Sequence, residues 1–202
     1  IQTAQVQVQY LFEGSTGPKI VYNVPPQTRS TINVNQELGY SWSGPGQSLS
    51  MIVTSLNGVG IVAERPMYFQ WRGINSGTDA LGATQLSQDY YFADVESERN
   101  YTSFITVLNP PGGQTANVTL TYIAHGAQVG SGSMTLVVPA GQRGTTIPQT
   151  FGINAQVALH VHSDQPVVVE RPMYFSTVRA GVGPLTGAAT VVGTPAPGTD
   201  WL

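Results

Sequence analysis

The sequence predicts an all-β protein made of antiparallel β-sandwiches, and three observations carry this prediction. Apolar and polar residues alternate along many short segments, stretches rich in glycine and proline separate these segments, and the hexapeptide ERPMYF occurs twice, at Glu64–Phe69 and Glu170–Phe175. A period of two places every second side chain on one face of a strand. Many short strands between turns are typical of a sandwich.

The expected strands are the alternating segments. They include Gln5–Phe12, Ser48–Val53, Asn117–Tyr122 and Val157–His162, each with apolar side chains at every second position. The turn sequences between them are EGSTG, NVPPQ, SGPGQ, NPPGG, GSGS and PAGQRG. Helical periodicity is nearly absent, so the strands must pair mainly with one another.

An internal repeat extends beyond the hexapeptide. AQVQVQYLFEG near the start matches ANVTLTYIAHG, VPPQTRSTI matches VPAGQRGTTI, and IVAERPMYF matches VVVERPMYF, in the same order along the chain. DALGAT similarly resembles PLTGAAT. The spacing drifts, which places insertions in loops. We therefore expect two tandem immunoglobulin-like modules of about a hundred residues, a common domain size.

The two copies differ at their leading ends. The predicted modules are residues 1–87 and 88–198, and residues 199–202 resemble the start of a further repeat, since Asp200-Trp201 falls on Asp89-Tyr90. The segment Asp89–Pro110 has no counterpart in the first copy. The first sandwich is therefore expected to lack its opening strand or strands. A longer array or a strand from a neighbouring chain would complete it.

Composition excludes several classes of protein. Only 9% of the 202 residues are charged and the net charge is −3, so no basic surface for nucleic acid or anionic lipid is expected. Cysteine is absent, which removes disulfides and thiol chemistry. No signal peptide and no apolar run of about 20 residues, the length of a membrane span, is present. The low charge and β-rich pattern favour an extracellular or cell-surface location.

The motif order also resembles a known repeat. An aromatic pair followed by FA(D/E), then NP, a V-P…R…T segment, ERPMYF and GA(A)T resembles a repeat of secreted and surface proteins of Chloroflexota and Actinobacteria. The residues that carry it are Tyr90–Asp94, Phe104–Pro110, Val138–Ile147, Val167–Phe175 and Gly187–Thr190. The resemblance implies location and architecture, with no established enzymatic activity. One departure is Val95, where the family often has glycine after its acidic residue.

The repeated hexapeptide is interpreted as architecture. A glycosidase needs two carboxylates about 5 to 10 Å apart, and each module offers one such glutamate beside an arginine that would lower its pKa. Proline is expected to end or edge a strand, and further arginines at matching places suggest a buried Glu–Arg network in each module. The motif residues are Glu64, Arg65, Pro66, Glu170, Arg171, Pro172, Arg29 and Arg143.

A weak metal candidate is the pair His160 and His162, followed by Asp164. Two imidazoles on one strand face can bind zinc or copper, but the first copy has no equivalent and no third ligand is fixed. The simpler interpretation is an outward polar face. We therefore expect no metal. Since no G-x-S-x-G elbow and no nucleotide-binding loop occurs in the sequence, we also expect no cofactor and no catalytic residue.

Aromatic residues are the main indication of ligand binding. Tyr40 and Trp42 lie in ELGYSWSGPG, which has no clear equal in the second copy, and Trp71 follows the first hexapeptide. Such rings can stack on sugars, although Trp42 could equally fill a sandwich core. Asn100 and Asn117 fit the acceptor pattern for N-glycosylation.

The preferred function is that of a non-enzymatic structural module. We expect a subunit or fragment of a cell-surface array or filament, assembled by strand complementation between copies of itself or neighbouring modules. An adhesin or a module that binds surface polysaccharide is the first alternative. A secreted hydrolase is the second, and it would require a carboxylate pair in a cleft that the sequence does not reveal.

Overall fold

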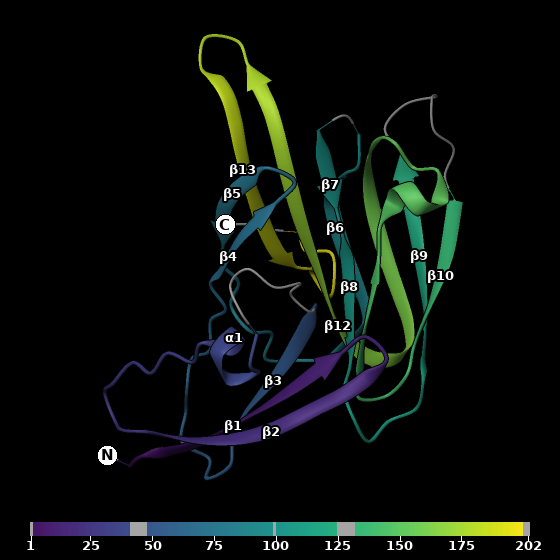
Figure 1. Ribbon diagram of the computed structural model, residues 1–202. Coiled ribbons are helices and arrows are strands. Elements are labelled where there is room, and N and C mark those ends of the chain that lie inside the picture. The colour runs from purple at the N-terminus through teal and green to yellow at the C-terminus, as the bar shows by residue number, and fades with distance from the viewer. Residues whose placement is uncertain (1, 41–47, 99, 125–131, 200–202) are drawn as a thin grey trace. The chain divides into compact units, whose positions relative to one another are not determined.

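The computed structural model describes residues 2–40, 48–98, 100–124 and 132–199 (Figure 1). The fold is almost entirely β, and the sheets are antiparallel, as the sequence predicts. The described helices are a four-residue α1, Val34–Glu37, and a four-residue 3-10 turn, Pro148–Phe151. The chain forms two compact units, Ile1–Ala63 and Glu64–Leu202, which we call unit 1 and unit 2.

Unit 1 contains a three-stranded sheet in the order β2-β1-β3. Its strands are β1 (Ala4–Phe12), β2 (Ser15–Val24) and β3 (Leu49–Ser55). Gly14 has a φ of 81° in the tight β1–β2 turn, a conformation that suits glycine. Alternation puts Ala4, Val6 and Val8 on the buried face of β1.

Unit 2 is organised around β12, a strand of 24 residues that takes part in two sheets. Residues 156–163 of β12 pair with β9 and β6, and β9 pairs in turn with β10. Residues 168–179 pair with β8, β7 and β13, and β8 pairs with β11. The bounds are β6 (Ser87–Glu96), β7 (Tyr101–Ser103), β8 (Ile105–Asn109), β9 (Ala116–Ala124), β10 (Gly132–Val138), β11 (Gln142–Thr146), β12 (Gln156–Arg179) and β13 (Gly183–Val192).

The core of unit 2 is formed by side chains from both sheets. Val118, Leu120 and Val161 come from one sheet, and Val107 and Val169 from the other; all are at most 1% exposed. The two sheets therefore enclose a shared apolar layer in a sandwich-like arrangement. In β12, Val157, Leu159 and Val161 enter this layer, as the alternation predicts, and Val167 and Val169 enter it further along the strand.

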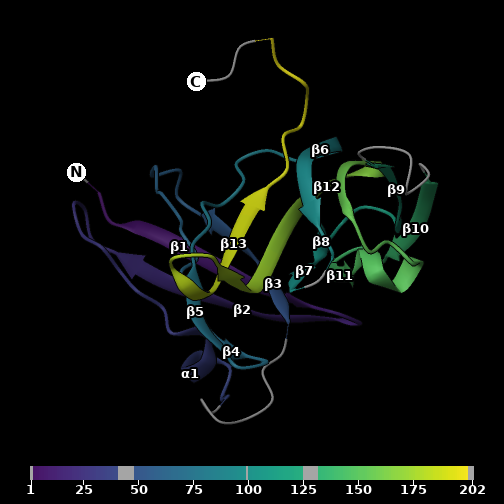
Figure 2. The same cartoon turned by 90° about the horizontal axis from the view of Figure 1, so that it is seen from above.

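A short hairpin completes unit 2. It consists of β4 (Met67–Trp71) and β5 (Ile74–Thr78), and β5 lies beside β13 (Figures 1 and 2). Positive φ at Arg72 and Gly73 gives the tight turn between them. Sequence repetition assigns this hairpin to a module ending at residue 87, whereas the compact units divide after Ala63. The reason lies in contacts between the two ERPMYF copies, described below.

The internal repeat extends to the pairing register of the strands. Val8 on β1 lies opposite Ile20 and Val53, and Leu120 on β9 lies opposite Met134 and Val161. The order β2-β1-β3 thus corresponds to β10-β9-β12 strand for strand, and Val53 occupies the position of Val161. Neither described helix is of a length and character that could cross a membrane.

Candidate functional site

The two ERPMYF copies meet within unit 2. Arg65 Nη2 donates a hydrogen bond of 3.0 Å to Glu170 Oε2, and the two side chains are 26% and 19% exposed. The first copy thus supplies the cation and the second the carboxylate. Backbone contacts hold the first copy in place, because Arg65 N donates to Ala80 O and Glu64 bridges to Leu81.

Aromatic rings extend this contact. The Tyr174 ring lies 4.9 Å from both Phe69 and Trp71, measured between ring centroids, and Phe104 lies within 6.0 Å of Trp71 and Tyr174. Edge-to-face packing of this kind stabilises a contact beyond the area that it buries. Burial raises the pKa of the Tyr174 hydroxyl, while the charges of Arg65 and Arg143 act in the opposite direction. The repeated motif therefore works as a packing interface.

The two prolines of the motif occupy different positions. Pro66 directly precedes β4, as expected for a residue that ends or edges a strand. Pro172 instead lies inside β12, where the sequence does not predict it. Residues 168–170 pair with β8 and residues 173–175 with β7, so Pro172 falls between these two ladders. Its missing N–H therefore interrupts neither ladder.

The arginines also differ from the expected network closed within each module. Arg171 is 8% exposed and directs Nη1 to Met173 Sδ, and burial lowers the pKa of its guanidinium. Arg143 lies half-buried on β11, opposite Leu108. Arg29 is exposed in unit 1, while its supposed partner Glu64 belongs to unit 2 and is exposed too. The ion pair seen at Glu170 joins the two copies rather than closing one.

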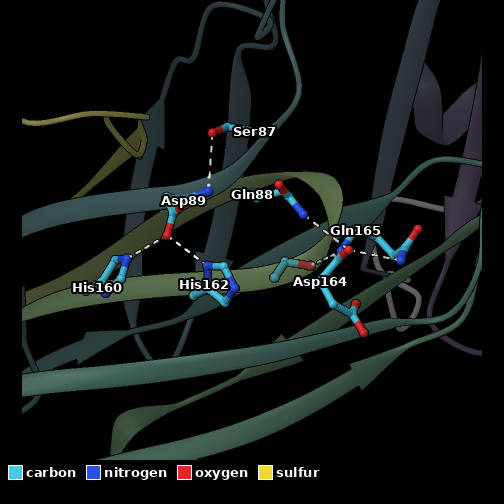
Figure 3. Close-up of polar contacts among 8 residues, drawn as sticks. Ser87, Gln88, Asp89, His160, His162, Asp164 and Gln165 are labelled. Atoms are coloured by element: carbon cyan, nitrogen blue, oxygen red, sulfur yellow. Dashed lines mark hydrogen bonds and ion pairs between the residues drawn. The ribbon is translucent and has the colours of Figure 1, made fainter.

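His160 and His162 share one carboxylate on the outer face of unit 2 (Figure 3). Their Nε2 and Nδ1 atoms, respectively, lie 2.8 and 2.9 Å from Asp89 Oδ1, and the Tyr91 ring stacks on His160 at 4.5 Å. An ionised carboxylate only accepts, so both ring nitrogens donate. Hydrogen bonds from His162 and then His160 lower the pKa of Asp89.

The described side chains around this cluster do not complete a set of three metal ligands. Among the described residues no group of three or more His, Asp or Glu side chains is arranged to hold a metal ion. Asp164, the expected third member, accepts two hydrogen bonds from Asn117, at 2.8 Å from its backbone N and 2.7 Å from Nδ2. The sequence could not reveal the role of Asp89, which reaches the histidines from a different strand, β6.

The proposed ligand-binding residues are not gathered at one place. Trp71 is packed among Tyr174 and Phe104, and the Arg72 guanidinium lies 4.7 Å over its ring. Tyr40 is half-buried after α1, and Trp42 lies outside the described residues. Asn100 is exposed, whereas the Asn117 amide is bonded to Asp164. A flat aromatic platform for sugar is not seen at Trp71.

Two cavities stand out in the described part of unit 2. One, of about 10 Å³, is enclosed by apolar core residues around Leu120 and Ile153 and is too small for any substrate. The other is an open groove of about 490 Å³ between residues 79–84 and 190–192. Its lining contains one carboxylate, Asp79, so the pair needed for glycoside hydrolysis is missing there.

The clearest unfilled position lies at β3 in unit 1. In unit 2 the matching part of β12 is flanked by β9 and β6, and Val161 is 1% exposed. In unit 1, β3 pairs with β1, and no described strand pairs with its other edge. Val53, the counterpart of Val161, is 37% exposed. The side of β3 away from β1 thus leaves Val53 exposed, whereas its counterpart in β12 is buried.

Backbone groups point outward along the same edge. Leu56 N donates to Gln5 O on β1, so the even-numbered residues of β3 direct their backbone N–H and C=O groups toward β1. Hydrogen-bonding directions alternate along an antiparallel strand. Val53 and Met51 therefore direct their N–H and C=O groups away from β1, toward the position that β6 fills in unit 2. We call residues 49–55, with these outward groups, the β3 edge.

Comparison with known proteins gives little further information. No protein-family model matches the chain, and no curated protein matches it. The crystal structure of Thermotoga maritima 1070 is similar at a TM-score of 0.46 and 14% identity, over 56% of this chain and 97% of that chain. Similarity at this level supports no conclusion about fold or function.

Proposed function

We propose that this protein is a non-enzymatic structural module that assembles by addition of a β-strand to the β3 edge. The observation that carries the proposal is the contrast between Val53, 37% exposed, and Val161, 1% exposed, at matching positions of the repeat. An incoming strand gains main-chain hydrogen bonds from the outward groups of Val53 and Met51 and covers their side chains.

The exposed edge is long enough to act as a template. β3 contains seven residues, and natural proteins usually protect such an edge with charges, proline or a bulge. The sequence LSMIVTS has neither a charged residue nor a proline. Strand addition therefore meets no evident obstacle at β3, which makes this edge better suited to association than to permanent exposure.

A structural role also agrees with the candidate chemical groups. Glu170 is held in an ion pair with Arg65, within a cluster of packed aromatic rings. Asp89 is bonded to two histidines on an open sheet face. We place the module outside the cell or on its surface, in line with its low charge and β-rich pattern. Protease digestion of intact producing cells would release it if that location is correct.

The experiment compares two proline variants of the chain. Val53→Pro removes an outward N–H at the β3 edge, and Val21→Pro does the same on β2, at the opposite edge of the same sheet. Size-exclusion chromatography with light scattering should show concentration-dependent assembly of the unmodified chain and of Val21→Pro. Val53→Pro should remain monomeric with an unchanged far-ultraviolet circular dichroism spectrum. Equal assembly by all three would refute strand addition at β3.

A further inference from the structure

We propose that the strand added to the β3 edge is β3 of a second copy of this chain, so that two copies pair antiparallel about a two-fold axis at Ile52. This inference rests on the proposed function and identifies its partner. All the groups involved belong to the described strand, Leu49–Ser55.

The side chains of β3 have the same chemical order in both directions. Met51 and Val53, both apolar, flank Ile52 at the centre. Ser50 and Thr54, both hydroxyl residues, follow on the two sides. A two-fold axis opposes residues that lie at equal distances on either side of it. With the axis at Ile52, apolar residues therefore oppose apolar residues and hydroxyls oppose hydroxyls, which makes β3 complementary to its own copy.

The backbone of β3 agrees with the same axis. Odd-numbered residues direct their N–H and C=O groups away from β1. With the axis at Ile52, Met51 of one chain lies opposite Val53 of the other, so outward groups meet outward groups, as an antiparallel ladder requires. An axis between two residues would oppose odd-numbered with even-numbered residues and leave the outward groups unmatched.

The neighbouring positions for the axis fit less well. An axis at Met51 would keep the backbone ladder but set Ile52 against Ser50, and an axis at Val53 would set Ile52 against Thr54. The axis at Ile52 leaves one pair of unlike residues, Leu49 with Ser55, at the two ends of the strand. Backbone and side chains together therefore select Ile52.

Pairing in this register covers the exposed part of β3. Val53, which is 37% exposed, gains Met51 of the second copy as its cross-strand neighbour. Ile52 and its copy form a pair without mutual hydrogen bonds, in which opposed side chains approach most closely, and such apolar pairs stabilise a sheet. β3 has no charged residue, so the axis brings no like charges together. The three-stranded sheets of the two copies join into one continuous sheet.

Disulfide trapping tests the partner and its register together. The chain has no cysteine, so an introduced thiol reports on a single position. Ile52→Cys, mildly oxidised, should form a cross-linked homodimer, because the Cα atoms of such a directly opposed pair lie about 4.5 Å apart, within disulfide range. Absence of this product together with absence of a cross-link in mixed Ser50→Cys and Thr54→Cys chains would overturn the inference.

Thr54→Cys by itself is the matched control. It lies on the same face of the same strand, but its copy is displaced by four residues, roughly 13 Å along the strand, so it should not cross-link. Cross-linking of Thr54→Cys as efficient as that of Ile52→Cys would show chance collision or another register and would overturn the axis at Ile52.

Assembly measurements separate this inference from the proposed function. A contact of this symmetry closes on itself, so light scattering should give a dimer that Val53→Pro abolishes. If Val53→Pro is monomeric but the unmodified chain forms species larger than a dimer, or neither cysteine pair cross-links, another strand is the partner and this inference fails alone. If Val53→Pro assembles as the unmodified chain does, the proposed strand addition itself fails.

Discussion

Arg65 and Glu170 belong to different copies of the same hexapeptide, and they form an ion pair with an N–O distance of 3.0 Å. Glu170→Gln should lower the free energy of unfolding by about 1–3 kcal/mol, because a partly buried guanidinium loses its charged acceptor. Glu64→Gln is a matched control at the same motif position, where the side chain is exposed, and should change it by less than about 0.5 kcal/mol. Equal losses in urea unfolding would contradict a selective role for Glu170.

The packing of Trp71 against Tyr174 gives a second prediction. Trp71→Ala should lower the free energy of unfolding by about 2–4 kcal/mol, less than for a fully buried tryptophan because this side chain is only half-buried. Tyr68→Ala, on the same hairpin but 74% exposed, should have little effect. Thermal unfolding followed by circular dichroism measures both. A fully stable Trp71→Ala that loses binding to a polysaccharide would instead favour the adhesin hypothesis.

The Asp89 carboxyl predicts a dependence of stability on pH. Its pKa is lowered in the folded state by hydrogen bonds from His162 and His160, so it contributes stability above its unfolded pKa of about 4 and loses it as pH falls further. Asp89 and the two histidines are partly exposed, so the effect on the free energy of unfolding should not exceed about 1 kcal/mol. Asp89→Asn should be less stable than the unmodified chain at pH 6, and the difference should shrink toward pH 3.

Asp79→Asn, at an exposed position of unit 2, is the control for this measurement. In urea unfolding at several pH values, the free energy of unfolding of this variant should differ from that of the unmodified chain by the same small amount at every pH. A difference for Asp89→Asn that stays constant from pH 6 to pH 3 would mean that the histidine contacts do not act through the ionised carboxylate.

Gly193 gives a test of how the end of β13 closes over β6. A Cβ atom built at this residue would lie 2.6 Å from Phe92 Cζ and 2.9 Å from Tyr90 Cβ. Gly193→Ala should therefore destabilise the protein by about 1–3 kcal/mol through overpacking. Gly60→Ala, where nothing lies within 4 Å, should be nearly neutral. Similar midpoints in denaturant for these two variants would contradict such close packing.

Much of the fold follows from sequence periodicity. The alternation in Gln5–Phe12 and Asn117–Tyr122 predicts β1 and β9, and matching residues of the two copies have the same pairing register. These predictions succeed because one buried face fixes both the period and the register of a strand. The opening segment that only the second copy has contains β7, β8 and most of β6. The position beside β3 that corresponds to β6 is unfilled among the described residues.

Other features depend on contacts that no local pattern encodes. The pairing of Arg65 with Glu170 joins residues 105 positions apart, and identical copies gave no reason to expect them to meet. Asp89 joins His160 only through the register of β6 with β12. Pro172 is tolerated inside a strand because two partner strands end beside it. Each depends on which distant segments become neighbours.

The length of β12 has a consequence for synthesis on the ribosome. β6, β7, β8 and β9 precede it in the chain, and all four pair with it. These segments emerge before their common partner exists, and their pairing must wait until residues 156–175 of β12 have left the exit tunnel. Non-local pairing of this kind makes closure slow and late. Nascent chains stalled before β12 should therefore be the stage most in need of a chaperone.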